Sequence, residues 1–200
     1  MKNFKQIDLD INEYLDLSSD LTKLLNDGKI KWNEKFKPNQ ICLTTVENLP
    51  GDYDLGCGSL EKDWSKSEYV ENSDGSVYLD APARTDNLKE EDFTILCKQF
   101  KNTGFELLYE ELKERYEISG RVKLFKNLPR SCMSWHHDVN PRIHYAIKTQ
   151  PGCYMVIEDE VFHIPQNQCW FTNTTKNHTA FNGSKEDRIH IVFETKSKVE

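Results

Sequence analysis

The sequence predicts a mainly β protein of the α+β class, with helices in its N-terminal part and a jelly-roll core. Three observations lead to this prediction. After Gly120, eight short β-prone segments follow one another closely; turn residues separate these segments; and apolar residues recur at helical spacing before that point. Short strands at even spacing are typical of a β-sandwich or a jelly-roll barrel.

Most of the expected elements in the first part of the chain are short. The alternating stretch 4–11 and the β-prone stretch 40–46 predict strands, and the three- and four-residue spacing of apolar residues in 13–25 predicts an amphipathic helix. Polar residues and glycines fill 48–74, which predicts a long loop of the kind that often covers a site. A further short strand is expected at 76–79.

A helical pattern returns between Leu88 and Tyr116. One apolar stripe precedes Thr103 and another follows it, and Thr103-Gly-Phe-Glu106 matches a capping box. We therefore expect two helices in this segment, with a break at Thr103.

The remaining strands are expected in the C-terminal part, where asparagine, proline and glycine residues mark the turns. Their expected ranges are 121–125, 132–138, 142–148, 154–157, 161–164, 168–171, 178–181 and 188–194. Residues 1–118 are thus expected to form an α-rich buttress with a long loop, and residues 119–195 the β core that carries the site. The length fits a single domain that spans 1–200.

Composition and charge exclude several classes of protein. With 26 basic and 33 acidic residues the formal net charge is −7, so a nucleic-acid partner is unexpected. No apolar run approaches the roughly 18 residues of a membrane helix, and the start, MKNFKQIDLDI, has no apolar signal region. We expect a cytoplasmic protein with no membrane partner. Its six cysteines, none of them spaced as CxxC, are then expected to be free thiols.

All six histidines lie in the C-terminal part, and two of them suggest a metal site. Because residues two apart on a strand point to the same face, His136 and Asp138 can aim together while His137 points away. His178, on a distant strand, is the best candidate for a third ligand. Two imidazoles and one carboxylate on one face are the arrangement of non-haem Fe(II) oxygenases. Arg188, ten residues after His178, would bind a carboxylate through its planar guanidinium.

The order and spacing of these residues resemble the Fe(II)/2-oxoglutarate-dependent dioxygenases. The closer resemblance is to the aspartyl/asparaginyl β-hydroxylase branch, which includes free-proline hydroxylases, because Arg142-Ile-His144 matches an R-x-H motif of that branch. The resemblance covers roughly residues 120–194. Asp138 keeps the carboxylate ligand, as in the proline-hydroxylase relatives, but Phe125 stands where those enzymes use a serine to help hold 2-oxoglutarate.

The resemblance implies a double-stranded β-helix of cupin-like type and a hydroxylase that needs Fe(II), 2-oxoglutarate and O2. The residues implied to hold the iron are His136, Asp138 and His178. Arg188 is implied to bind the remote carboxylate of 2-oxoglutarate, with Arg142 and His144 near the end that chelates iron. The reaction would convert 2-oxoglutarate to succinate and CO2 and hydroxylate an unactivated C–H bond. The implied substrate is a proline-like amino acid, or an Asp, Asn or Pro residue in a peptide.

Three further residues are candidates for substrate contact. Trp135 and His137 flank the first ligand and could line the substrate mouth, with a surface position as the alternative. Asn182 could place its amide over the substrate, although Asn182-Gly183 is foremost a tight-turn signal.

Other classes of function remain open from the sequence alone. A cupin-like protein could hold a metal or small molecule as a binding or sensor protein, without turnover. A zinc hydrolase is disfavoured because no HExxH motif supplies a general base. The substrate could be a small molecule or a peptide, and the sequence leaves the oligomeric state undetermined.

Overall fold

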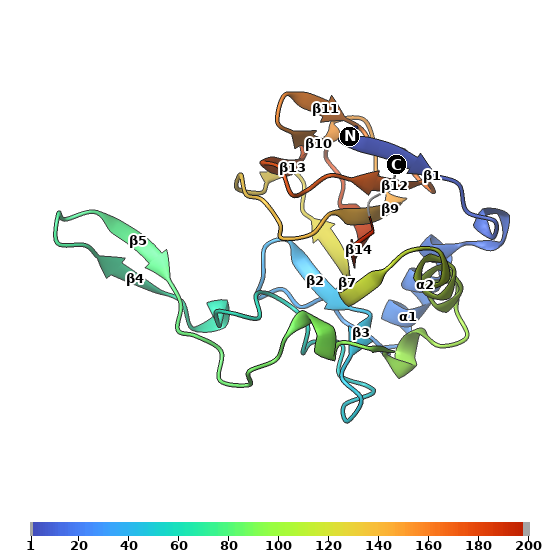
Figure 1. Cartoon of the computed structure of the whole chain (residues 1–200), viewed down its shortest axis with the longest axis horizontal. Helices are drawn as coiled ribbons and strands as arrows, with labels where there is room; N and C mark the ends of the chain where they lie inside the picture. The colour runs from blue at the N-terminus through green and yellow to red at the C-terminus, as the bar shows by residue number, and fades with distance from the viewer. Residues whose placement is uncertain (1, 198–200) are drawn as a thin grey trace.

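The computed structural model describes residues 2–197, and two antiparallel sheets form its centre (Figure 1). The larger sheet has the order β1 (Phe4–Ile7), β12 (Cys169–Thr172), β9 (Arg142–Lys148), β14 (Arg188–Thr195), β7 (Ile118–Asn127) and β2 (Asn39–Cys42). The smaller sheet has the order β11 (Glu160–Phe162), β10 (Cys153–Ile157), β13 (His178–Asn182) and β8 (Ser131–Cys132). Sequence neighbours are rarely sheet neighbours in this topology, as in a jelly roll. The predicted fold class is confirmed.

The other elements belong to the first 116 residues. The α-helices are α1 (Leu17–Asn26) and α2 (Gly104–Arg115), and the short 3₁₀ helices are η1 (Asn12–Tyr14), η2 (Trp64–Lys66), η3 (Glu90–Asp92) and η4 (Lys98–Phe100). Two small strand pairs are β3 (Thr44–Thr45) with β6 (Ile95–Leu96), and β4 (Glu68–Glu71) with β5 (Val77–Asp80). The β4–β5 hairpin projects away from the rest of the molecule (Figure 1).

The two helices begin where the sequence offers caps. The Asp16 side chain accepts a hydrogen bond from the backbone N–H of Ser19, and Thr103 accepts one from that of Phe105. These contacts satisfy backbone donors that the first turn of a helix leaves free. The apolar faces of α1 and α2 share one core cluster with residues of β2, β7, β9, β12 and β14. The helices therefore cover one face of the larger sheet.

Alternation along β7 explains how the same strand serves both the core and a cavity. Val122 and Leu124 are fully buried in the core cluster. The residues that alternate with them point to the opposite face and line a cavity; these are Arg121, Lys123 and Phe125. The larger sheet is therefore apolar toward the helices and polar toward the site.

The prediction of a helix between Leu88 and Thr103 is wrong. That segment instead contains η3, β6 and η4. Leu96 pairs with Thr44 in a short ladder, and the N–H of Cys97 donates to the carbonyl of Leu43 at 2.7 Å. Because these backbone groups bond to another segment, they cannot form a helix, and the helical spacing of the buried side chains is a coincidence of packing.

The strand expected at 132–138 is also largely wrong. Regular pairing with β13 ends at Cys132, and Met133 still bonds to Ala180 by its N–H at 3.0 Å. The next bridge joins His136 to His178. From Met133 to His136 there are three residue steps, whereas from Ala180 to His178 there are two. One extra residue therefore interrupts the ladder, as in a β-bulge.

Smaller differences occur in the first part of the chain. The strand expected at 40–46 is split into β2 and β3, and the loop expected at 48–74 contains η2 and β4. Tyr14, expected on the apolar face of a helix, lies in η1 with its side chain 71% exposed. Residues 2–118 thus contain two α-helices among short strands and turns, so the part expected at 1–118 to be α-rich is helical only in places.

All six cysteines are free thiols, as expected, and five of them are buried. Within residues 2–197, no helix is long and apolar enough to span a lipid bilayer.

Candidate metal centre

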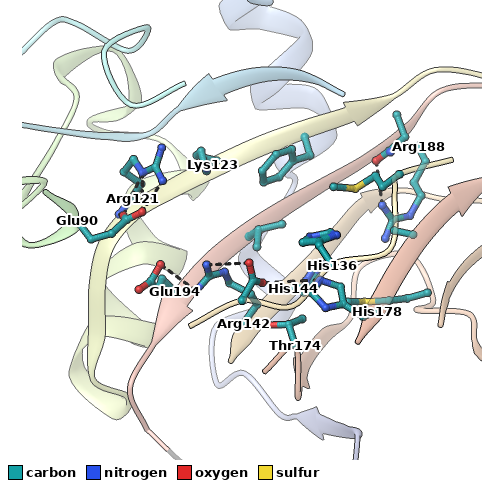
Figure 2. Close-up of a pocket in the computed structure, with 17 residues that line it drawn as sticks. Glu90, Arg121, Lys123, His136, Arg142, His144, Thr174, His178, Arg188 and Glu194 are labelled. Carbon is teal, nitrogen blue, oxygen red and sulfur yellow. Dashed lines mark hydrogen bonds and ion pairs between the residues drawn. The ribbon is translucent and has the colours of Figure 1, made fainter. Parts of the chain in front are cut away.

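A cavity lies between the two sheets and contains most of the residues that the sequence singled out (Figure 2). One wall comes from β7, β9 and β14 of the larger sheet. The other wall comes from β10, β13 and the irregular segment 133–138. Because the two walls come from separate sheets, side chains from distant parts of the chain face one another across the cavity.

The three candidate metal ligands converge in this cavity. Ligand atoms of His136, Asp138 and His178 all lie within 4.8 Å of one another. The two imidazole centroids are 4.2 Å apart, and the Nε2 atom of His178 lies 3.8 Å from an oxygen of Asp138. The convergence predicted from strand alternation is thus present, although the bulged segment, and not a regular strand, produces it.

Backbone hydrogen bonds fix the tautomers of both histidines. The Nδ1 atom of His136 lies 2.8 Å from the carbonyl of Ser134, and the Nδ1 atom of His178 lies 3.0 Å from that of Lys176. Because a carbonyl only accepts, each Nδ1 carries the hydrogen and each Nε2 presents a lone pair. Carbonyl partners of this kind orient metal-binding histidines in proteins.

The protonation state of His178 also suits a metal ion. Burial lowers the pKa of His178, and the nearby His136 lowers it further. His178 is therefore neutral at pH 7, which metal binding requires. Two imidazoles and one carboxylate fit the nitrogen and oxygen preferences of Fe(II) and leave coordination positions for other ligands.

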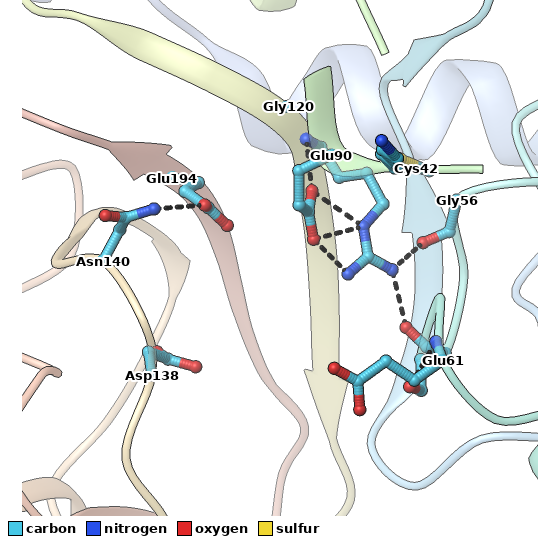
Figure 3. Close-up of polar contacts among 12 residues, drawn as sticks. Cys42, Gly56, Glu61, Glu90, Gly120, Asp138, Asn140 and Glu194 are labelled. Carbon is cyan, nitrogen blue, oxygen red and sulfur yellow. Dashed lines mark hydrogen bonds and ion pairs between the residues drawn. The ribbon is translucent and has the colours of Figure 1, made fainter. Parts of the chain in front are cut away.

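Arg142 holds the carboxylate ligand in place. Its guanidinium lies 3.3 Å from Asp138 and 2.8 Å from Glu194 (Figure 2). Asn140 donates to the other oxygen of Glu194 at 2.8 Å (Figure 3). With both carboxylates paired to it, Arg142 orients Asp138 toward the histidines. Its expected contact with 2-oxoglutarate stays a prediction.

Arg188 presents the opposite case, a buried guanidinium that has no carboxylate partner among residues 2–197. The side chain is 4% exposed and donates to Asn127 Oδ1 and to His190 Nδ1, both at 3.1 Å. Both acceptors are neutral, so the positive charge is uncompensated, and burial lowers the pKa of Arg188 to about 10. A buried charge of this kind favours binding of an anion from solution.

His144 and His190 pack beside Arg188 as neutral rings. Their centroids are 5.8 Å apart, and burial, with the charge of Arg188, lowers the pKa of both well below the usual range. His144 lines the cavity, and its buried Nδ1 has no hydrogen-bond partner in the described part of the chain. This open position is consistent with a ligand contact, which stays a prediction.

The three candidate substrate residues do not line the cavity. Trp135 is 57% exposed and His137 is also exposed, so the alternative of a surface position holds for both. Asn182 is fully buried, and its amide donates to Asn127 and Glu186 and accepts from Ser184. Because the turn uses the whole amide, Asn182 has no group left for a substrate.

Sequence reasoning missed several charged residues of the cavity, among them Glu90, Arg121, Lys123 and Glu194. Arg121 forms an ion pair with Glu90 and donates to the carbonyls of Gly56 and Gly58 (Figure 3). A signal was present in the sequence for two of these residues: Arg121 and Lys123 alternate with the apolar Val122 and Leu124. Alternation of this kind inside a buried strand indicates a polar cavity.

The long segment 48–74 does not cover the cavity in this structure. No residue of that range lines it, and the contact with Arg121 is made by two backbone carbonyls at its edge. The expectation of a covering loop therefore stays a prediction.

The chain resembles known proteins both in sequence and in structure. A model of the family described as aspartyl/asparaginyl β-hydroxylase matches residues 59–197. The L-proline cis-4-hydroxylase of Rhizobium meliloti (strain 1021) is 24% identical over 175 residues, which cover 84% of this chain and 59% of that protein. The chain thus spans about three-fifths of the length of the curated relative that it matches.

Among solved structures, an oxidoreductase of the 2OG-Fe(II) oxygenase family from Burkholderia pseudomallei superposes with a TM-score of 0.51. It is 10% identical, and the match covers 98% of this chain and 85% of that one. A cupin domain from Bordetella pertussis matches 38% of this chain and 81% of its own, with 14% identity and a TM-score of 0.34. The first of these likenesses extends over nearly the whole chain and supports the same fold.

Proposed function

Since the chain belongs to the aspartyl/asparaginyl β-hydroxylase family, we propose that it is an Fe(II)- and 2-oxoglutarate-dependent dioxygenase. It would hydroxylate an unactivated C–H bond of a proline-like amino acid, or of an Asp, Asn or Pro residue in a peptide. The proposal takes residues 1–200 as one dioxygenase domain, supported by the core cluster that joins the helices to the larger sheet.

One observation carries the proposal: an uncompensated guanidinium faces the same cavity as a two-histidine, one-carboxylate cluster. Arg188 lacks a carboxylate partner among residues 2–197, whereas His136, Asp138 and His178 bring their ligand atoms together. A dicarboxylate that chelates a metal with one end and needs a cation at the other end matches both features.

The residues of the chain have distinct roles in this proposal. His136, Asp138 and His178 would hold Fe(II), which when bound supplies the activation of O2 that C–H hydroxylation requires. Arg142 keeps Asp138 oriented by its ion pair, and the carbonyl-bonded Nδ1 atoms keep both imidazoles turned toward the metal position. Arg188 would bind the remote carboxylate of 2-oxoglutarate in a geometry that lysine cannot reproduce.

Two features support chemistry that is kept from bulk water. Phe125, Val192 and Met155 contribute apolar surface to the cavity between its polar groups. His144 and His190 stay neutral because of burial, so they add hydrogen-bonding capacity near Arg188 without adding charge. The substrate classes are proposed from the family and from the proline hydroxylase relative.

The deciding experiment is a turnover assay. The purified protein with Fe(II), 2-oxoglutarate and O2 should release succinate, and a panel of free amino acids and of peptides, tested separately, should reveal a product heavier by one oxygen. Mass spectrometry measures both products. If 2-oxoglutarate is bound and no succinate forms with any substrate, the binding or sensor alternative replaces the dioxygenase.

A further inference from the structure

The four cationic side chains that line the cavity fall into two groups. Arg142 is paired with Asp138 and Glu194, and Arg121 is paired with Glu90. Lys123 and Arg188 form no ion pair with any carboxylate among residues 2–197. The paired cations organise the protein itself, so the two unpaired ones are left for ligands.

Lys123 lies in the cavity at a distance from Arg188. Its ammonium is 5.2 Å from the ring centre of Phe125, the next residue on the same face of β7. Asn127, which accepts from Arg188, is four residues further along, about 13 Å at the usual rise of ~3.3 Å per residue. Figure 2 shows Lys123 near Arg121 and Glu90, with Arg188 toward the other end.

One molecule of 2-oxoglutarate cannot reach both cations and the metal. A chain of five carbons spans roughly 5–7 Å, judged from the ~3.6 Å that three backbone bonds can cover. In the proposed function one carboxylate of 2-oxoglutarate lies at Arg188 and the other end at the metal. Lys123 is therefore left for the second organic substrate.

We propose that Lys123 binds a carboxylate of the molecule that is hydroxylated, which excludes substrates that carry no carboxylate. This inference rests on the proposed function and specifies its substrate. The carboxylate can belong to a free amino acid or to an Asp side chain of a peptide, since the ammonium recognises the same group in both. A charged hydrogen bond of this kind contributes more than a neutral one.

The surroundings of Lys123 favour an added anion. The charged and titratable groups that face it are Arg121, Cys42, Glu90 and Arg142. Burial, with the like charges of Arg121 and Arg142, lowers the pKa of Lys123 to about 8, and Cys42 and Glu90 oppose this only in part. Glu90 attracts the ammonium, but both of its carboxylate oxygens accept hydrogen bonds from Arg121. A bound carboxylate would compensate the ammonium and raise its pKa again.

Calorimetric titration under anaerobic conditions, with Fe(II) and 2-oxoglutarate present, tests this inference without turnover. The first arm compares L-proline with L-prolinamide. The second compares a peptide with blocked termini that contains Asp with the same peptide containing Asn. In at least one arm we expect the carboxylate to bind about 10- to 150-fold more tightly than its amide.

Two variants connect the preference to the side chain. Lys123→Met removes the charge at similar length and should abolish the preference, with the affinity for 2-oxoglutarate unchanged. Lys123→Arg should keep it. Between pH 7 and pH 9.5 the wild-type preference should decline, because the pKa of free Lys123 is about 8, while Lys123→Arg should retain it.

Several results would overturn the inference. Equal affinity for carboxylate and amide in both arms would do so, as would the absence of binding in both arms. A preference that survives in Lys123→Met, or a loss of 2-oxoglutarate affinity in that variant, would also contradict it. Failure of the proposed function is separate, because it shows as the absence of succinate from the wild-type protein.

Discussion

Arg142 and Arg188 occupy the same cavity but differ in what surrounds them. Arg142 is held between two carboxylates, whereas Arg188 is held by an amide oxygen and an imidazole nitrogen. The first arrangement neutralises the guanidinium and fixes a neighbouring side chain. The second positions the guanidinium and leaves its charge available. Two arginines of one cavity can thus differ in how far their charge is compensated, because the acceptors around them differ.

The largest effect should come from the ligand cluster between these two arginines. His136→Ala, Asp138→Ala and His178→Ala should each weaken Fe(II) binding by at least about 100-fold, since even the partners of metal ligands contribute 10- to 100-fold. The weak visible charge-transfer band of an anaerobic Fe(II)–2-oxoglutarate complex should disappear in each variant. His137→Ala is the matched control, because His137 is exposed and outside the cavity, and it should keep the band.

The next effect tests the unpaired arginine. Arg188→Lys keeps a positive charge and loses the planar fork, so the Kd for 2-oxoglutarate should rise about 10- to 150-fold while Fe(II) affinity stays the same. Titration of the charge-transfer band with each component measures both affinities. An unchanged Kd for 2-oxoglutarate would remove Arg188 from this role.

The paired arginine should respond in the opposite way. Arg142→Lys loses one of two carboxylate contacts and should loosen Asp138, which lowers Fe(II) affinity by about 10- to 100-fold. Its effect on 2-oxoglutarate, measured at saturating Fe(II), should be smaller than that of Arg188→Lys. If both variants weaken 2-oxoglutarate equally, the distinction between the two arginines is wrong.

The smallest effect concerns the neutral acceptor beside Arg188. The pKa of folded His190 is well below its ordinary value of about 6.5, so below that pH the unfolded chain binds a proton that the folded chain does not. The free energy of unfolding of the metal-free protein should therefore decrease as the pH is lowered below about 6.5. His190 contributes a slope of at most about 1.4 kcal/mol per pH unit to this free energy. Above pH 6.5 its contribution no longer changes with pH.

His190→Asn provides the comparison for this measurement, because the amide oxygen can accept from Arg188 in place of Nδ1. Urea unfolding at several pH values between 5 and 7.5 should show a shallower pH dependence in the variant than in the wild type. Equal slopes would mean that His190 does not resist protonation in the folded state.

The sequence predicted the parts of the fold that depend on local patterns. Alternation and turn residues located β9 and β14 almost to the residue, and the helical stripe after Thr103 located α2. The prediction of a helix before Thr103 failed because the backbone there bonds to Leu43 and pairs with Thr44, which are far away in the sequence. A periodic pattern of apolar residues indicates which side chains are buried. It does not decide whether the backbone forms one helix or several short strands and turns.

The candidate site shows the same division between local and distant information. His136, Asp138 and His178 could be selected because spacing and residue type are local signals. The ion pair between Arg142 and Glu194 depends on the register of β9 against β14, which places these residues opposite each other. No sequence pattern encodes that register, so the role of Glu194 and the difference between the arginines became visible only in three dimensions.

The bridge between His136 and His178 has a consequence for how a metal would be acquired. The two residues exchange both backbone hydrogen bonds, at 3.1 and 2.8 Å, and the N–H of Asp138 bonds to Thr174 at 2.8 Å. The backbone therefore sets the spacing of the candidate ligands in advance, so an ion that binds there would have little chain entropy to overcome. An ion could then bind and dissociate without separation of the two sheets. A chelator should therefore remove the ion and leave a folded, metal-free protein that can bind the metal again.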